Sequence, residues 1–182
     1  MKRANDFADY RRLFETVLVI ILALVFVVIA AKRIYELRIT AEQVGVAHTV
    51  GALRTGLSHR VVELALQGDM GALAGLAQAN PLDFLKEAPT RYVTLEGPLP
   101  PEDMLPYHWY FEPATGVLTY RVGNEDALIT ALPPPARIRF RVQLDYADEN
   151  GNGRFDPKTD VISRLDLVPL EPYAWRTPQE DP

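Results

Sequence analysis

The chain has 182 residues, of which 48% are hydrophobic and 24% charged, so it is long enough for one folded core and short for two. Its net charge of -5 argues against a general affinity for nucleic acid, whose phosphates call for a basic surface. Because the chain contains no cysteine, it cannot form disulfides, iron–sulfur clusters or cysteine-ligated zinc sites.

An uninterrupted apolar segment, residues 14–31, follows a polar stretch of residues 1–13. At about 1.5 Å per residue, a helix over this segment and its flanks covers a hydrocarbon core roughly 30 Å thick. Its only charged side chain is Glu15, at its start. Lys32 and Arg33 follow directly, where a signal peptide would have a small-residue cleavage site. We therefore predict a retained transmembrane helix over residues 14–31.

Apolar residues continue to recur at steps of three and four, which predicts an amphipathic stem helix over residues 32–67. Glycines within the stem each weaken an isolated helix by about 1 kcal/mol relative to alanine, so we expect the stem to pack against other structure. The predicted buried stripe includes Val44, Ala47, Val50, Leu53 and Leu57.

Residues 68–182 are predicted to form an extracytoplasmic head. Gly68 is the expected C-cap of the stem, and Asp69 the N-cap of a short second helix that Asn80 and Pro81 end. Alternating patterns then predict strands over residues 107–112, 117–122, 138–146 and about 161–170. The predicted fold class is therefore α+β, with a long N-terminal helix packed on a small antiparallel β-sheet.

Residues 148–160, between the last two predicted strands, have the spacing of a calcium loop. Side-chain oxygens recur at alternate positions and Gly153 stands at the turn, an arrangement that suits calcium. The twelfth position is Thr159 instead of the glutamate of an EF-hand, and strands flank the loop. The candidate ligands are Asp148, Asn150, Asn152, the backbone carbonyl of Arg154, Asp156 and Asp160.

Two interpretations of this loop are open. Three converging carboxylates would repel one another without a cation, which favours calcium with a role in ordering the hairpin. The alternative is an ion-free turn whose Asp and Asn side chains accept hydrogen bonds from their own backbone amides, because these residues dominate turns.

The sequence contains no phosphate-binding loop, nucleophile elbow or zinc-protease motif. His48 and His59 lie about 16 Å apart on the predicted helix and cannot share a metal, and His108 is expected to be structural. The aromatic residues at 107–111 are expected to pack within the sheet. We therefore expect no enzymatic activity and no catalytic residue.

The order of polar N-terminus, apolar helix with an initial glutamate, stem and antiparallel sheet resembles the type IV pilin superfamily, and most closely the pseudopilins of type II secretion. In that family a glutamate at the fifth position of the mature helix meets the N-terminal amine of a neighbouring subunit. The run LFETVLVIILALVFVVIAA places Glu15 at that position. The runs NPLDFL (80–85) and WYFEPATGVLTYRV (109–122) look like those of pilin-like minor subunits, and a calcium-held loop is familiar among major pseudopilins.

The leader departs from the family pattern. With Glu15 as the fifth residue, Tyr10 stands where prepilins carry glycine before the cleavage point, and Arg11 stands where phenylalanine is expected. The resemblance therefore implies a pilin-like subunit with a non-standard leader, and it leaves cleavage and N-methylation open.

The resemblance implies a structural subunit of a type II secretion or type IV pilus assembly machine in the bacterial inner membrane. A short tail ahead of a first membrane helix favours a cytoplasmic N-terminus, with the C-terminal domain in the periplasm. Expected partners are other pilin-like subunits, the inner-membrane assembly platform and membrane lipid, with Glu15 acting in assembly. The alternative is a membrane-tethered periplasmic ligand-binding or sensor module whose stem pairs as a coiled coil.

Overall fold

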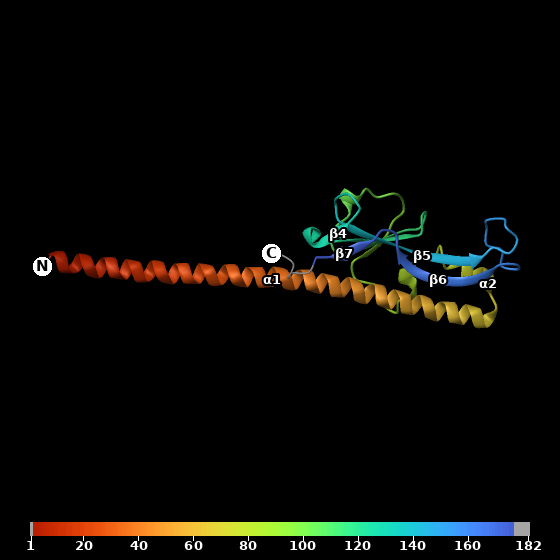
Figure 1. The fold of residues 1–182 in the computed structure, drawn as a ribbon, viewed down its shortest axis with the longest axis horizontal. Helices are drawn as coiled ribbons and strands as arrows, with labels where there is room; N and C mark the ends of the chain where they lie inside the picture. The colour runs from red at the N-terminus through yellow and green to blue at the C-terminus, as the bar shows by residue number, and fades with distance from the viewer. Residues whose placement is uncertain (1, 177–182) are drawn as a thin grey trace. The chain divides into compact units, whose positions relative to one another are not determined.

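The computed structural model describes the backbone of residues 2–176 and the side chains of residues 12–176. The chain divides into two compact units, of which one ends at Ala41 and the other begins at Glu42. One helix, α1 (Lys2–Gln67), supplies the described part of the first unit and continues as the first element of the second (Figure 1). The second unit, here called the head, therefore includes the second half of α1, which contributes to its core.

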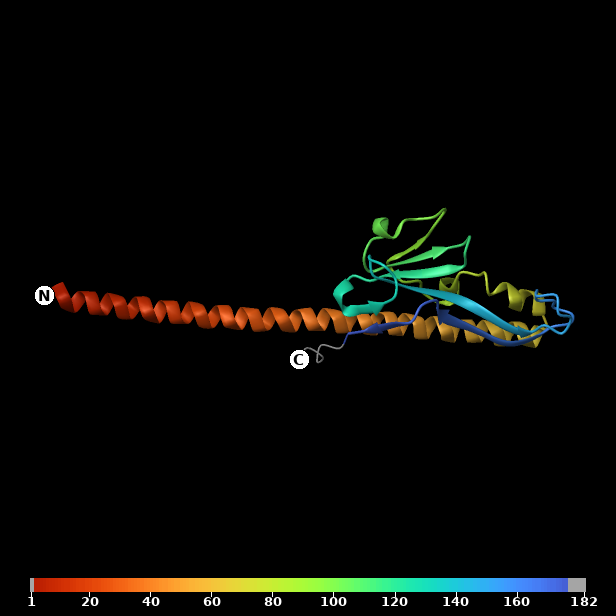
Figure 2. The same cartoon turned by 45° about the horizontal axis from the view of Figure 1, so that its top comes forward.

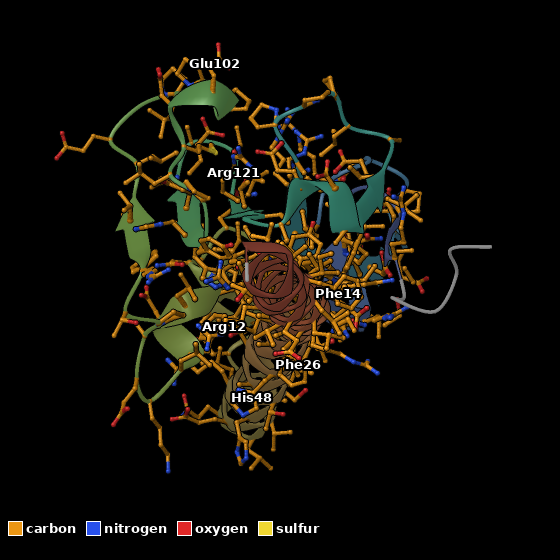
Figure 3. The ribbon with its side chains drawn as sticks, turned by 90° about the vertical axis from the view of Figure 1, so that its left-hand side faces the viewer. Arg12, Phe14, Phe26, His48, Glu102 and Arg121 are labelled. Carbon is orange, nitrogen blue, oxygen red and sulfur yellow. The ribbon has the colours of Figure 1, made fainter. Side chains whose placement is uncertain are left out.

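The first unit is helical throughout its described part. An 18-residue window of α1 has a mean hydropathy of 3.0, and none of that window is buried. Phe14 and Phe26, for example, are both exposed and project from the helix in Figure 3, which looks along its axis. This part of α1 is therefore long and apolar enough to cross a membrane.

The end of α1 and the short helix after it confirm the predicted caps. Gly68 adopts a positive φ of 71° directly after Gln67, as a helix C-cap often requires. The Asp69 carboxylate accepts a hydrogen bond from the backbone N–H of Ala72 at 2.8 Å, which caps α2 (Met70–Gly75). Asn80 then caps the 3₁₀ helix η1 (Pro81–Phe84).

Four of the predicted strands are confirmed and belong to one five-stranded sheet, in the order β1-β2-β3-β5-β6. They are β2 (His108–Glu112), β3 (Val117–Arg121), β5 (Arg137–Ala147) and β6 (Val161–Pro169). These four pair antiparallel, as predicted. The edge strand β1 (Tyr92–Thr94) was not predicted; it lies parallel to β2, so the sheet as a whole is mixed.

Two further three-residue strands form a second, two-stranded sheet. They are β4 (Leu128–Thr130) and β7 (Tyr173–Trp175), which pair antiparallel. The single-turn helices η2 (Pro101–Asp103) and η3 (Glu125–Ala127) lie in the connections before β2 and before β4. Strands this short carry too little alternation to be recognised from sequence.

The core of the head lies between one face of the five-stranded sheet and the second half of α1, an arrangement that Figures 1 and 2 show from two sides. The alternation in β5 is confirmed where Ile138, Phe140 and Val142 are buried. Leu118 of β3 lies opposite Phe140, and Leu167 of β6 lies opposite Val142, so the three central strands supply one continuous apolar layer.

The buried face of α1 agrees with the predicted stripe from Val50 onward, where Val50, Leu53 and Leu57 are buried. Earlier in the helix the prediction was wrong, because Val44 is 60% exposed and Ala47 is exposed as well. In this part of α1 the buried residues are instead on the face that contains Glu42 and Val46. Because Glu42 is charged, the face of the helix that contains it looked less apolar than the neighbouring face. The sequence alone therefore favoured the neighbouring face as the buried one.

Candidate functional site

Glu15, the predicted assembly residue, lies on α1 within the first unit, near the start of the exposed apolar part of the helix. Its carboxylate is the only acidic group between Arg12 and Ala31. A charged group on an apolar helix costs free energy in a bilayer unless it meets water or a partner of opposite charge. This position therefore suits a contact made at one end of a membrane helix.

The most heavily hydrogen-bonded side chain at the start of the head is Glu42 of α1, which is only 8% exposed. Its Oε1 accepts hydrogen bonds from the Tyr120 hydroxyl at 3.0 Å and from the Gly123 N–H at 2.7 Å. Its Oε2 accepts from the Asn124 N–H at 3.0 Å and from the Asn124 side-chain amide at 2.6 Å. Four donors compensate the desolvation of this carboxylate, so it ties the end of β3 and the following turn to α1.

Burial raises the pKa of the Tyr120 hydroxyl above its ordinary value of 10.0, and the nearby negative charge of Glu42 and the hydrogen bond to it raise the pKa further. Tyr120 therefore remains protonated and continues to donate to Glu42 throughout the neutral range. The pair is a structural anchor, since neither group faces a second reactive side chain in the described network.

Glu42 was not among the residues predicted from sequence. The available signal was its position: it stands four residues before Val46 and eight before Val50, on the face of α1 that proves to be buried. A carboxylate on the same helix face as core residues has two explanations. Either the buried face is interrupted there, or the carboxylate is buried and accepts hydrogen bonds. Only its partners, which lie about 80 residues away along the chain, separate the two cases.

In the first half of the loop 148–160, the predicted metal-ligating oxygens accept hydrogen bonds from backbone amides. Asp148 Oδ1 accepts from the N–H groups of Gly151 and Asn152, and Oδ2 accepts from Gly153 at 2.7 Å. Asn150 Oδ1 accepts from the N–H of Asn152 at 3.0 Å, and Asn152 Oδ1 accepts from that of Arg154 at 2.7 Å. These bonds order the turn.

The second half of the loop is held by Asp160, which is 7% exposed. Its Oδ1 accepts from the Glu149 N–H at 3.1 Å and its Oδ2 from the Asp156 N–H at 2.7 Å, so one carboxylate joins the two halves of the loop. Asp156 in turn accepts from the Lys158 N–H at 3.0 Å. These hydrogen bonds are the ones that the second interpretation expects, and the remaining lone pairs of the same oxygens leave the first interpretation open.

The predicted calcium ligands include two Asn side chains and a backbone carbonyl besides the three Asp side chains. Among the residues that the structure describes, no three His, Cys, Asp or Glu side chains are grouped closely enough to hold a metal ion. Asp148, Asn150, Asn152, Asp156 and Asp160 each point at least one oxygen at a loop amide. Calcium binding by this loop stays a prediction.

The aromatic residues of β2 pack as expected. Trp109 and Phe111 are buried, and the Trp109 ring lies 4.8 Å from the Tyr120 ring and 6.2 Å from the Phe140 ring, measured between centroids. Tyr110 is buried on the opposite face of the strand, where its hydroxyl accepts a hydrogen bond from the Leu105 N–H at 2.8 Å. These contacts stabilise the sheet.

Comparison with known proteins identified no relative. No protein-family model matches the chain, and no curated protein or solved structure matches it significantly.

Proposed function

We propose that this protein is a pilin-like structural subunit, of the pseudopilin kind, in a type II secretion or type IV pilus assembly machine. The observation that carries the proposal is α1 itself. One uninterrupted helix has an exposed apolar first half, while its second half packs on the β-sheet of the head. A subunit of this kind acts by helix packing in the membrane and by surface contacts of its head, without enzymatic chemistry.

Glu15 is the proposed assembly residue. Its carboxylate lies near one end of the apolar part of α1, where a cationic group of a neighbouring subunit would offset the cost of holding a charge at the membrane. In this proposal the N-terminus is cytoplasmic, the head is in the periplasm, and the partners are other pilin-like subunits, the inner-membrane assembly platform and lipid.

Co-purification of the full-length protein in mild detergent tests this function. We expect the tagged chain to recover secretion or pilus subunits, and Glu15→Gln to lower that recovery several-fold. Glu63→Gln is the matched control, because Glu63 is a surface residue of the head that pairs only with Arg60 of the same helix. Recovery of a lone homodimer that binds a small molecule would contradict the proposal and support the sensor alternative.

The leader is tested separately by mass spectrometry of the mature N-terminus. Since Tyr10 and Arg11 replace the usual residues around the cleavage point, we propose that the subunit keeps its leader. A mature chain that begins at Arg11 would show that the leader is processed in spite of these replacements.

A further inference from the structure

The face of the five-stranded sheet that points away from α1 carries four arginines on two neighbouring strands. Arg121 of β3 lies directly opposite Arg137 of β5, and Arg139 and Arg141 follow at alternate positions along β5. In Figure 3, Arg121 and Glu102 mark this side of the head. Such a gathering is notable in a chain whose net charge is -5, because like charges on adjacent strands repel one another.

The positive charges of the four guanidinium groups are neutralised by carboxylates to different extents. Arg121 is buried and pairs with Glu125 at 2.5 Å, although its Nε has no partner within the described residues. Arg139 forms an ion pair with Glu171. The other two have no carboxylate partner in the described part of the chain: Arg137 donates only to the carbonyls of Pro133 and Pro135, and exposed Arg141 has no hydrogen bond or ion pair.

Burial lowers the pKa of Arg137, and repulsion by Arg139 lowers it further. The pKa of Arg139 is raised instead, chiefly by its hydrogen bond to Glu171. Attraction by Glu171 and Glu102 opposes these effects on the pKa of Arg137. An anion placed beside Arg137 and Arg141 would meet two guanidinium groups that form no ion pair within the described residues.

Three of these arginines, Arg137, Arg139 and Arg141, line one groove of about 470 Å³. Its remaining lining is mixed. The apolar residues include Leu99 and Met104 from the loop before β2, Val117 of β3, and Leu170 after β6, and the polar residues include Glu171, which pairs with Arg139. Glu112 also borders the groove, and its Oε2 accepts a hydrogen bond from the Thr115 hydroxyl at 2.5 Å. The groove thus combines a row of three arginines with two carboxylates and several apolar side chains.

We propose that this groove binds an extended acidic peptide segment of a partner protein, with carboxylates at alternate positions and apolar side chains between them. Alternate residues of a strand are separated by about 6.8 Å, which is the spacing of Arg137, Arg139 and Arg141 along β5. Alternate side chains of an extended peptide have the same spacing, so several carboxylates can meet the row at once. The apolar residues of the lining can contact the rest of such a segment, a contact that a bare anion would not make.

The inference goes beyond the proposed assembly function and does not depend on it. The groove belongs wholly to the head, and its charge and shape would recognise an acidic segment in a secretion subunit as well as in any other protein. Nucleic acid is disfavoured because the surrounding chain is acidic and would repel an extended polyanion.

Fluorescence anisotropy with the full-length protein in neutral detergent tests the proposal. The probe is a labelled synthetic peptide that alternates glutamate and valine, compared with a peptide in which glutamine replaces glutamate. A third peptide of the same composition groups its glutamates together. We expect the alternating acidic peptide to bind, the glutamine peptide not to bind, and the grouped peptide to bind several-fold more weakly.

Arg141→Gln is the informative variant, because this exposed side chain has no partner whose loss would disturb folding. We expect it to weaken binding about tenfold, as loss of a charge-assisted hydrogen bond does. Arg176→Gln, at an exposed residue outside the groove, makes the same change of charge and should leave binding unchanged.

Equal effects of Arg141→Gln and Arg176→Gln would overturn the proposal, and so would equal binding of the acidic and glutamine peptides. Inorganic phosphate supplies the remaining comparison. If it competes with the peptide at an equal concentration, the groove takes small anions and not a peptide segment, and the proposal fails.

Discussion

Gly56 of α1 lies directly against Phe84 of η1: a Cβ added at Gly56 would be 2.5 Å from the Phe84 carbonyl oxygen and 3.0 Å from its Cβ. The backbone of η1 therefore approaches α1 at Gly56, which is the one residue of this helical turn that has no side chain. Gly45, on the same helix, has nothing within 4 Å of the equivalent point. The two glycines consequently predict opposite effects of the same substitution.

Gly56→Ala should destabilise the head by about 1–3 kcal/mol, because the added methyl group can be accommodated only if η1 moves. Gly45→Ala should instead stabilise the helix by up to about 1 kcal/mol, since alanine has the higher helix propensity and meets no neighbour. Denaturant unfolding followed by the fluorescence of buried Trp109 measures both changes. Equal effects of the two substitutions would contradict the close approach of η1.

Glu42→Gln should destabilise the head by about 2 kcal/mol or more. The amide has one acceptor oxygen where the carboxylate has two, and its NH2 group would face N–H donors of Gly123 or Asn124. Glu63→Gln serves as the control, because its pair with Arg60 lies on the surface and should contribute less than about 1 kcal/mol. A free energy of unfolding that changes equally in both variants would show that the Glu42 network adds little.

The raised pKa of Tyr120 predicts a loss of stability at alkaline pH. As the pH rises above 10, the unfolded state releases the hydroxyl proton while the folded state retains it. The stabilisation from this group is therefore complete below pH 10 and decreases above it, by at most about 1.4 kcal/mol per pH unit. Burial also raises the pKa of Tyr173, whose contribution has the same sign.

Tyr120→Phe separates the two tyrosines, because the variant retains Tyr173. We expect its free energy of unfolding, measured between pH 9 and pH 11, to fall less steeply than that of the unaltered protein. Identical slopes would show that the Tyr120 hydroxyl is not buried in the folded state.

The calcium prediction is tested by thermal melting of the full-length protein with calcium and with a chelator. An ion that binds only the folded state must raise the melting midpoint, by an amount that grows with its concentration. If calcium binds as predicted, Asp148→Asn should abolish that rise, since it removes a carboxylate oxygen. A midpoint that is the same in calcium and in chelator would leave the loop as the amide-capped turn described above.

The sequence by itself determined the features that depend on neighbours along the chain. The apolar run of residues 14–31, the helix end at Gln67, the caps at Gly68 and Asp69, and the alternation in β5 all act over a few residues. Hydropathy and periodicity are local quantities, so the α+β class and the potential membrane helix follow from them. The spacing of residues 148–160 likewise predicted an ordered turn, although not whether its oxygens serve an ion or their own amides.

Only the tertiary structure decided which face of α1 is buried near Glu42, which glycine of the stem is in close contact, and that β1 lies parallel to β2. It also brought Arg121 opposite Arg137 and placed both on one face with Arg139 and Arg141. These relationships depend on strand register and on packing between segments that lie far apart along the chain, such as Arg54 and Leu167, which are 113 residues apart. A one-residue shift in register would turn every side chain of a strand to the opposite face, and no local pattern excludes that shift.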